Sequence, residues 1–106
     1  MSPRALEILR RMAEHPDDAR GEIVCEWREC WLGAERLHRK TVTALLQVCA
    51  IRCDDFSTGL ERYTINETGK AICRRPDLAD EVFAAVLTGT QFSIVNDRVV
   101  LMEDTP

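Results

Sequence analysis

The sequence predicts an α+β fold in which helices come first and β-hairpins follow. Three observations predict this class. Apolar residues recur at three- and four-residue steps in four segments, the spacing of an amphipathic helix. Two pairs of short β-prone runs, within residues 51–65 and 91–102, are each joined by turn-forming residues. The chain has 106 residues, the length of one domain with a modest core.

Two helices are expected in the N-terminal third. The first follows Ser2, a suitable N-cap, and Pro3, a residue favoured at the first helical position. Pro16 ends it. Residues 22–31 predict a second helix, because four apolar side chains fall on one helical face: Ile23, Trp27, Cys30 and Trp31.

A third helix, a hairpin and a short helix are expected next. Residues 36–50 predict a helix whose core stripe recurs at helical spacing, and residues 51–65 predict a hairpin with Gly59 in its turn. Residues 66–75 predict a short helix with Asn66 as its cap. The stripe of the third helix contains Val42, Leu45, Leu46 and Cys49.

The C-terminal part predicts one more helix and one more hairpin. Asp77 and Asp80 have the spacing of a capping box, and Gly89 follows the last helical residues. Residues 91–102 predict a hairpin that turns at Asn96 and Asp97. We therefore expect residues 1–75 to form the main unit and residues 76–106 a helix-hairpin extension packed on the same domain.

Charge is unevenly distributed along the chain. The net charge is −4, with −2 over residues 1–27, +3 over residues 28–75 and −5 over residues 76–106. A basic middle segment between acidic ends permits local contact with a polyanion. The chain has no long apolar run and no export signal, so we expect a cytoplasmic protein without a membrane span.

No enzyme motif is present, and we expect no catalytic residue, cofactor or metal. The five cysteines lack a CxxC knuckle, and an odd count without an export signal argues against a disulfide framework. Buried thiols are the simpler interpretation, although Cys25, Cys30 and His38 have the side-chain chemistry of metal ligands. His15 and His38 are expected to be exposed polar residues.

Two phrases resemble a known family. The segment "HRKTVTALLQVCAI" and, after a hairpin loop, "ERYTINETGKAI" are similar to the recognition helix, wing and following helix start of winged helix-turn-helix regulators of the multiple-antibiotic-resistance type. The resemblance covers about residues 4–75. It implies three helices plus a hairpin wing, and a small non-enzymatic transcriptional regulator that binds double-stranded DNA with helix 36–50 and hairpin 51–65.

The outer side of the third helix carries the candidate site. Its side chains can donate hydrogen bonds and none is acidic, which suits phosphates and base-edge acceptors. Arginine and glutamine can read guanine and adenine, while lysine and threonine can hold phosphate. The predicted nucleic-acid-binding residues are Arg36, Arg39, Lys40, Thr43 and Gln47 on the helix and Arg62 on the wing.

Two other functions stay open. The same domain would serve as a protein-interaction module if its acidic surfaces bind a basic partner, and Glu35, Asp54 and Asp55 near the helix would favour that outcome. The apolar second hairpin is marginal by itself. A homodimer through residues 77–102 is therefore expected as an alternative to simple packing on the monomer.

Overall fold

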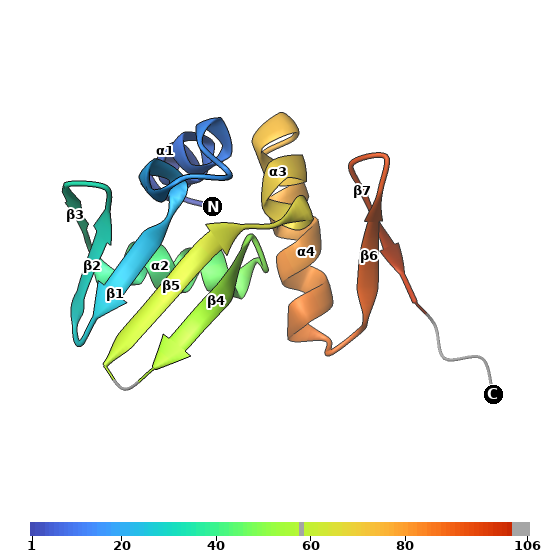
Figure 1. Ribbon diagram of the computed structural model, residues 1–106. Helices are drawn as coiled ribbons and strands as arrows, with labels where there is room; N and C mark the ends of the chain where they lie inside the picture. Colours follow the sequence, from blue (N-terminus) through green and yellow to red (C-terminus); the bar gives the residue numbers. More distant parts are fainter. Residues whose placement is uncertain (58, 103–106) are drawn as a thin grey trace.

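The computed structural model describes residues 1–57 and 59–102, and it confirms the α+β class. Four α-helices, a short 3-10 turn and seven strands follow one another along this part of the chain (Figure 1). The helices are α1 (Pro3–Glu14), α2 (Arg39–Gln47), α3 (Glu67–Arg74) and α4 (Leu78–Leu87), and the 3-10 turn is η1 (Ala19–Gly21). The strands are β1 (Ile23–Glu26), β2 (Glu29–Leu32), β3 (Glu35–Leu37), β4 (Ile51–Ser57), β5 (Leu60–Ile65), β6 (Phe92–Val95) and β7 (Arg98–Leu101).

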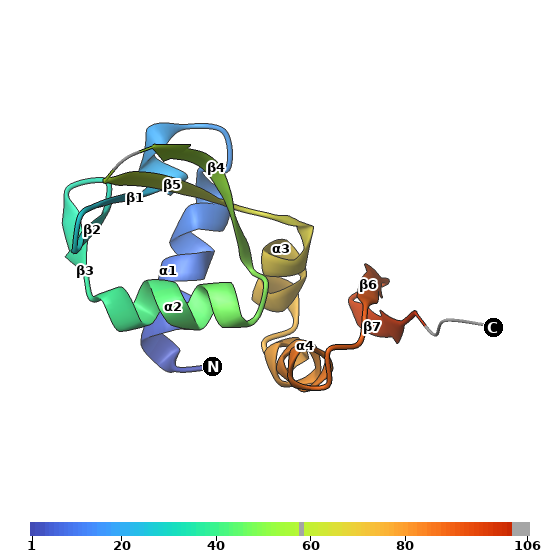
Figure 2. The same ribbon diagram turned by 90° about the horizontal axis from the view of Figure 1, so that it is seen from below.

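Five strands form one antiparallel sheet in the order β3-β2-β1-β5-β4. Helices α1, α2 and α3 lie on one side of this sheet, as Figure 2 shows. Strands β6 and β7 form a separate two-stranded sheet beside α4 (Figure 1). The main core therefore lies between one face of the large sheet and the three helices.

The expected second helix is wrong, because its residues form the β1–β2 hairpin. The reason lies in the burial pattern. Ile23 and Cys25 on β1, and Cys30 and Leu32 on β2, alternate with exposed or half-buried residues and point into the core. A helix would have buried Trp27, which instead occupies the hairpin turn with a φ of 57°.

The first helix is confirmed in position and cap. The Ser2 hydroxyl accepts a hydrogen bond from the Ala5 N–H at 3.2 Å, and Pro3 is the first helical residue. The side of α1 that faces the core is fully buried and packs against α2 and α3. This buried side consists of Ala5, Ile8, Leu9 and Met12.

The third predicted helix is confirmed but shorter than expected. It spans Arg39 to Gln47 rather than residues 36–50, and His38 Nδ1 accepts a hydrogen bond from the Lys40 N–H at 3.2 Å. Val42 and Leu45 are buried as expected, whereas Leu46 is 39% exposed. The helix ends because Cys49 adopts a left-handed φ of 55°, which turns the chain into β4.

The hairpin predicted for residues 51–65 and the helix after it agree with expectation. Strands β4 and β5 pair from Ile51↔Ile65 to Ser57↔Leu60. Asn66 caps α3, since its Oδ1 accepts a hydrogen bond from the Gly69 N–H at 2.8 Å.

The C-terminal extension also has the expected helix and hairpin. Strands β6 and β7 turn at Asn96 and Asp97, whose φ values of 50° and 58° are those of a tight two-residue turn. The Asp77 side chain makes no capping hydrogen bond, so the expected capping box is wrong. Leu78, Ala79 and Val82 of α4 belong to the same buried cluster as the helices and the large sheet. Residues 103–106 of the predicted extension lie outside the described residues.

Winged-helix topology is not confirmed. A hairpin and a third strand stand where the resemblance implies a helix, so α1 is followed by strands before α2 begins. The order of α2, the β4–β5 hairpin and α3 still matches the implied recognition helix, wing and following helix. Among the described residues, none of the helices is both long and apolar enough to cross a bilayer.

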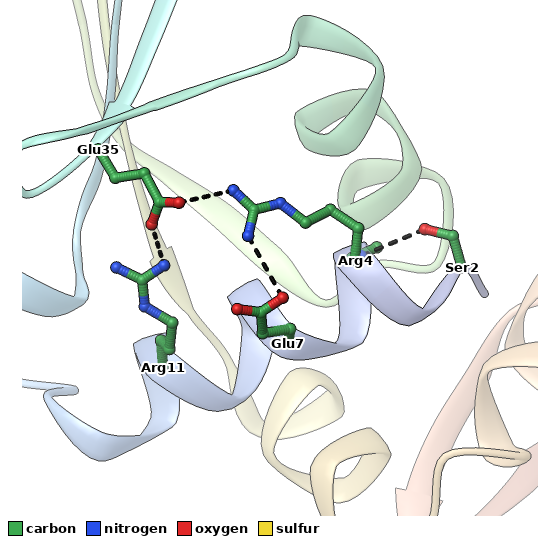
Figure 3. A network of polar contacts seen from close by, with 6 residues as sticks. Ser2, Arg4, Glu7, Arg11 and Glu35 are labelled. Carbon is green, nitrogen blue, oxygen red and sulfur yellow. Dashed lines mark hydrogen bonds and ion pairs between the residues drawn. The ribbon is translucent and has the colours of Figure 1, made fainter.

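Glu35 joins strand β3 to helix α1. Its carboxylate accepts hydrogen bonds from Arg4, at 2.8 Å, and from Arg11 (Figure 3). Arg4 also donates to Glu7 at 3.3 Å. The hydrogen bonds from Arg4 and Arg11 lower the pKa of the Glu35 carboxyl. Glu35 therefore lies against α1 and not beside the outer face of α2, contrary to expectation.

This arrangement predicts a specific sensitivity to acid. A carboxyl whose folded pKa is lowered contributes stability above its ordinary pKa of about 4.3, and that contribution is lost as pH falls towards the folded pKa. Glu35→Gln should therefore lose less stability than wild type between pH 7 and pH 3.5. Urea unfolding midpoints at both pH values measure the difference. Glu14→Gln, an exposed position of α1, is the control and should keep the wild-type loss; equal losses in all three proteins would contradict the prediction.

Candidate nucleic-acid interface

The outer side of α2 is exposed to solvent. Arg39, Lys40, Thr43 and Gln47 are all exposed, and the helix contains no acidic residue. Val42 and Leu45, on the opposite side, anchor the helix in the core. The structure thus brings four of the six predicted residues together on one exposed face, where Gln47 also lines a pocket with Asp80 and Phe83 of α4.

Arg39 stands at the start of α2 and reaches towards the sheet. Its Nη1 lies 3.7 Å from the Cys30 sulfur, and its Nη2 lies 3.7 Å from Glu61 Oε2. The Tyr63 hydroxyl donates to the same Glu61 carboxylate. The Cys30 contact and the Glu61 charge raise the pKa of Arg39, whose side chain is still 44% exposed. The guanidinium is therefore charged, held by a carboxylate and open to solvent.

Arg36 lies on β3 and not on α2, so its expected place on the helix face is wrong, whereas Arg62 lies on β5 of the hairpin, as expected. In the sheet, Arg36 pairs with Trp31, Trp31 with Val24, and Val24 with Arg62. Paired residues share one face of a sheet. Since Ile23 and Cys25 point into the core, this row points away from the helices. Arg36 lies outside α2 because the helix begins at Arg39, three residues later than expected.

Carboxylates accompany both of these arginines. Arg36 Nη2 lies 3.4 Å from Glu29 Oε1, and Arg62 lies 3.8 Å from Glu22 and 4.0 Å from Asp55. The outer face of the sheet is therefore charge-balanced rather than basic.

Asp54 and Asp55, which were expected to favour a protein partner, both pair within the β4–β5 hairpin. Arg52 Nε lies 2.9 Å from Asp54 Oδ1, and the Thr64 hydroxyl donates to Asp54 Oδ2. A bulge between Cys53 and Asp55 shifts the β4 register by one residue. Because of it, Asp55 pairs with Arg62 on the outer face of the sheet.

Two exposed aromatic side chains near the hairpin tips were not predicted as site residues. Trp27, in the β1–β2 turn, and Phe56, near the end of β4, are each 76% exposed. The Trp27 N–H donates to the Gly59 carbonyl at 2.8 Å, which joins the two tips. The sequence signal for Trp27 was lost when residues 22–31 were interpreted as a helix, because a turn position would have predicted exposure.

The thiols near α2 are buried rather than arranged for metal binding. Cys25 and Cys30 are directly opposite each other on β1 and β2, and both are buried. Burial and the neighbouring Cys30 thiol raise the pKa of Cys25 to about 12. Within residues 1–57 and 59–102, no group of three or more His, Cys, Asp or Glu side chains is placed to hold a metal ion. His38 caps α2 through its Nδ1 atom.

Comparison with family models, curated proteins and solved structures returns no match to this chain.

Proposed function

We propose that this chain is a non-enzymatic DNA-binding regulatory protein that places the exposed face of α2 in the major groove of duplex DNA. One observation carries the proposal: Arg39, Lys40, Thr43 and Gln47 share an exposed face on a helix without acidic residues. A helix that enters the major groove places its N-terminal residues nearest the bases, which is the end where Arg39 and Lys40 stand.

Each side chain has a role in this proposal. Lys40 and Thr43 contact phosphate oxygens, and Gln47 can pair with adenine N6 and N7. Arg39 reads guanine O6 and N7 after it leaves Glu61. The Arg39–Glu61 pair is 3.7 Å long and partly exposed, and pairs of this kind contribute little to stability. Arg39 can therefore exchange Glu61 for a guanine or a phosphate with little loss of stability.

The fold proposed for this activity is a variant winged helix. Helix α2 corresponds to the recognition helix and the β4–β5 hairpin to the wing, while the β1–β2 hairpin replaces the helix that would precede α2. Helix α3, capped by Asn66, follows the hairpin as in the "ERYTINETGKAI" phrase. The wing tip carries Phe56 and the adjacent turn carries Trp27, and both side chains would lie beside the DNA backbone or minor groove.

A protein-interaction module is the second candidate. It is favoured because Arg36, Arg39 and Arg62 all lie within 4.0 Å of carboxylates, which reduces the positive potential available to DNA. The chain's net charge of −4 would then favour a basic partner. The two candidates differ in the surface that acts: the α2 face on DNA, or the acidic surfaces of the chain on a basic protein.

Fluorescence anisotropy with a labelled random duplex separates them. The first candidate predicts binding that weakens steeply with salt, and the double substitution Arg39→Ala/Lys40→Ala should reduce the salt slope by about 0.9 for each lost phosphate contact. Affinity at low salt should fall at least about tenfold.

A charge-matched control removes two arginines elsewhere. Arg10→Ala/Arg20→Ala alters exposed positions on α1 and η1 and should keep the wild-type slope. If wild type fails to bind random duplex at low salt and also fails to bind DNA from its genetic neighbourhood, the DNA proposal is rejected and the protein-interaction module takes its place. Equal losses of DNA affinity in the two double variants would mean that only net charge matters and would reject the α2 site.

A further inference from the structure

The β6–β7 ribbon is a small sheet at the margin of the molecule (Figure 1). Neither of its strands pairs with any other strand of the described chain. Val95, Val100, Leu101 and Met102 are each between 45% and 56% exposed. An isolated two-stranded sheet is marginally stable, and an uncovered edge with apolar side chains is a template for another strand.

The outer edge of β7 has a defined hydrogen-bonding pattern. The Met102 N–H donates to the Gln91 carbonyl at 2.8 Å, so this pair is hydrogen-bonded. In an antiparallel ladder such pairs alternate with unbonded pairs, whose N–H and C=O groups point outward. Val99 and Leu101, opposite Ile94 and Phe92, are in the unbonded positions. Their backbone groups therefore point to the edge that β6 does not cover.

We propose that this edge binds a second copy of the chain, with β7 pairing antiparallel to β7 about a two-fold axis at Val100. In that register Val99 faces Leu101 of the second copy, and the two residues exchange both backbone hydrogen bonds. The two-fold axis creates the same pair of hydrogen bonds a second time, between Leu101 and Val99 of the second copy. The outward N–H groups of both residues in both copies are then bonded, and the two ribbons form one four-stranded sheet. The occupant is a second copy because Val100, an apolar residue that is 45% exposed, would meet Val100 of the second copy at the axis and be covered by it.

The side chains fit the same register. A groove of about 780 Å³ lies between α4 and β7. Ala84, Ala85 and Thr88 line its helix side and Val99 and Leu101 its strand side, together with the charged residues Arg75, Glu81, Asp97 and Arg98. The inward side chains of the added strand would enter this groove, where the two alanines leave space. Arg98 would lie opposite Met102 of the second copy, so no like charges meet.

Oligomeric state tests this inference independently of DNA binding. Light scattering on the full chain at about 100 μM should give twice the chain mass of 12.1 kDa. Val100→Lys places two ammonium groups at the axis and should give a monomer. Leu101→Pro removes an outward N–H and the leucine side chain from the groove, and should raise the dissociation constant at least about tenfold. Leu87→Lys, at a position of α4 that is 70% exposed, is the control and should stay dimeric.

A cross-linking experiment fixes the register. Unbonded antiparallel partners have Cα atoms about 4.5 Å apart, within the range that a disulfide spans. Val100→Cys should therefore form a covalent dimer when diamide oxidises the two thiols, in a chain whose exposed Cys53 is replaced by serine. Val95→Cys in the same background should not. A monomeric wild type, a dimer that survives Val100→Lys, or a monomeric Leu87→Lys would overturn the β7 pairing. Failure of DNA binding would leave it standing.

Discussion

Gly69→Ala is expected to destabilise the protein by about 3 kcal/mol or more, a large part of a typical folding free energy of 5–15 kcal/mol. A Cβ at Gly69 would lie 2.2 Å from the Ala50 carbonyl oxygen and 2.7 Å from Ile65 Cγ1. The Ala50 carbonyl belongs to the backbone, so it cannot move without displacing the junction between α2 and β4. The helix start would have to shift instead, which would also break the Asn66 cap.

Chemical denaturation followed by circular dichroism measures this effect. Gly33→Ala is the matched control, because a Cβ at Gly33 has no heavy atom within 4 Å among the described residues, although its φ is +59°. The left-handed backbone alone should cost about 1 kcal/mol. If Gly69→Ala is as stable as wild type, the close approach of α3 to the α2–β4 junction is contradicted.

Leu45→Ala is expected to cost about 2–5 kcal/mol. Leu45 is fully buried on the core side of α2, beside Val42. Truncation removes buried methyl groups and leaves a cavity that the sheet and α1 can fill only partly. Because α2 carries the proposed DNA-binding residues, loss of the packing that holds this helix should also weaken DNA binding by the variant.

The neighbouring residue provides the control for Leu45. Leu46 has the same side chain on the same helix but is 39% exposed, so Leu46→Ala should cost less than half as much. Thermal or urea unfolding of the two variants gives the comparison directly. Similar losses for both would contradict the assigned orientation of α2.

Much of the fold was predictable because its signals are local. The Ser2-Pro3 helix start, the Asn66 cap and the Asn96-Asp97 turn depend on residues close in sequence, and all three are present. The spacing of Val42 and Leu45 likewise identified the buried side of α2. The outer side of that helix followed from the same periodicity.

The β1–β2 hairpin was missed because its apolar residues satisfy two periods. Ile23, Trp27, Cys30 and Trp31 match a helical face, whereas Ile23 and Cys25 alternate as in a strand. Pairing with the rest of the sheet decides between helix and strand here, because β1 pairs with β5, which lies more than thirty residues later. That long-range pairing also places Arg62 on the face turned away from α2.

Ion pairing of the arginines was equally invisible in the sequence. Glu61 reaches Arg39 from another strand, and Glu35 reaches Arg4 and Arg11 across the core edge. These contacts join residues 22 to 31 positions apart, so the sequence predicted acidic residues, Glu35 and Glu61 among them, near the surface of α2 but not which arginine each one contacts. They reduce the predicted basic surface to the outer face of α2.

An NMR titration of the isotopically labelled full chain with a short duplex tests the central claim most directly. The DNA proposal predicts backbone amide shifts concentrated at residues 39–47, with further changes at residues 52–57 and 60–62, all reversed by added salt. Shifts confined to residues 83–102, or no shifts at low salt, would contradict the assignment of α2 as the DNA-binding element.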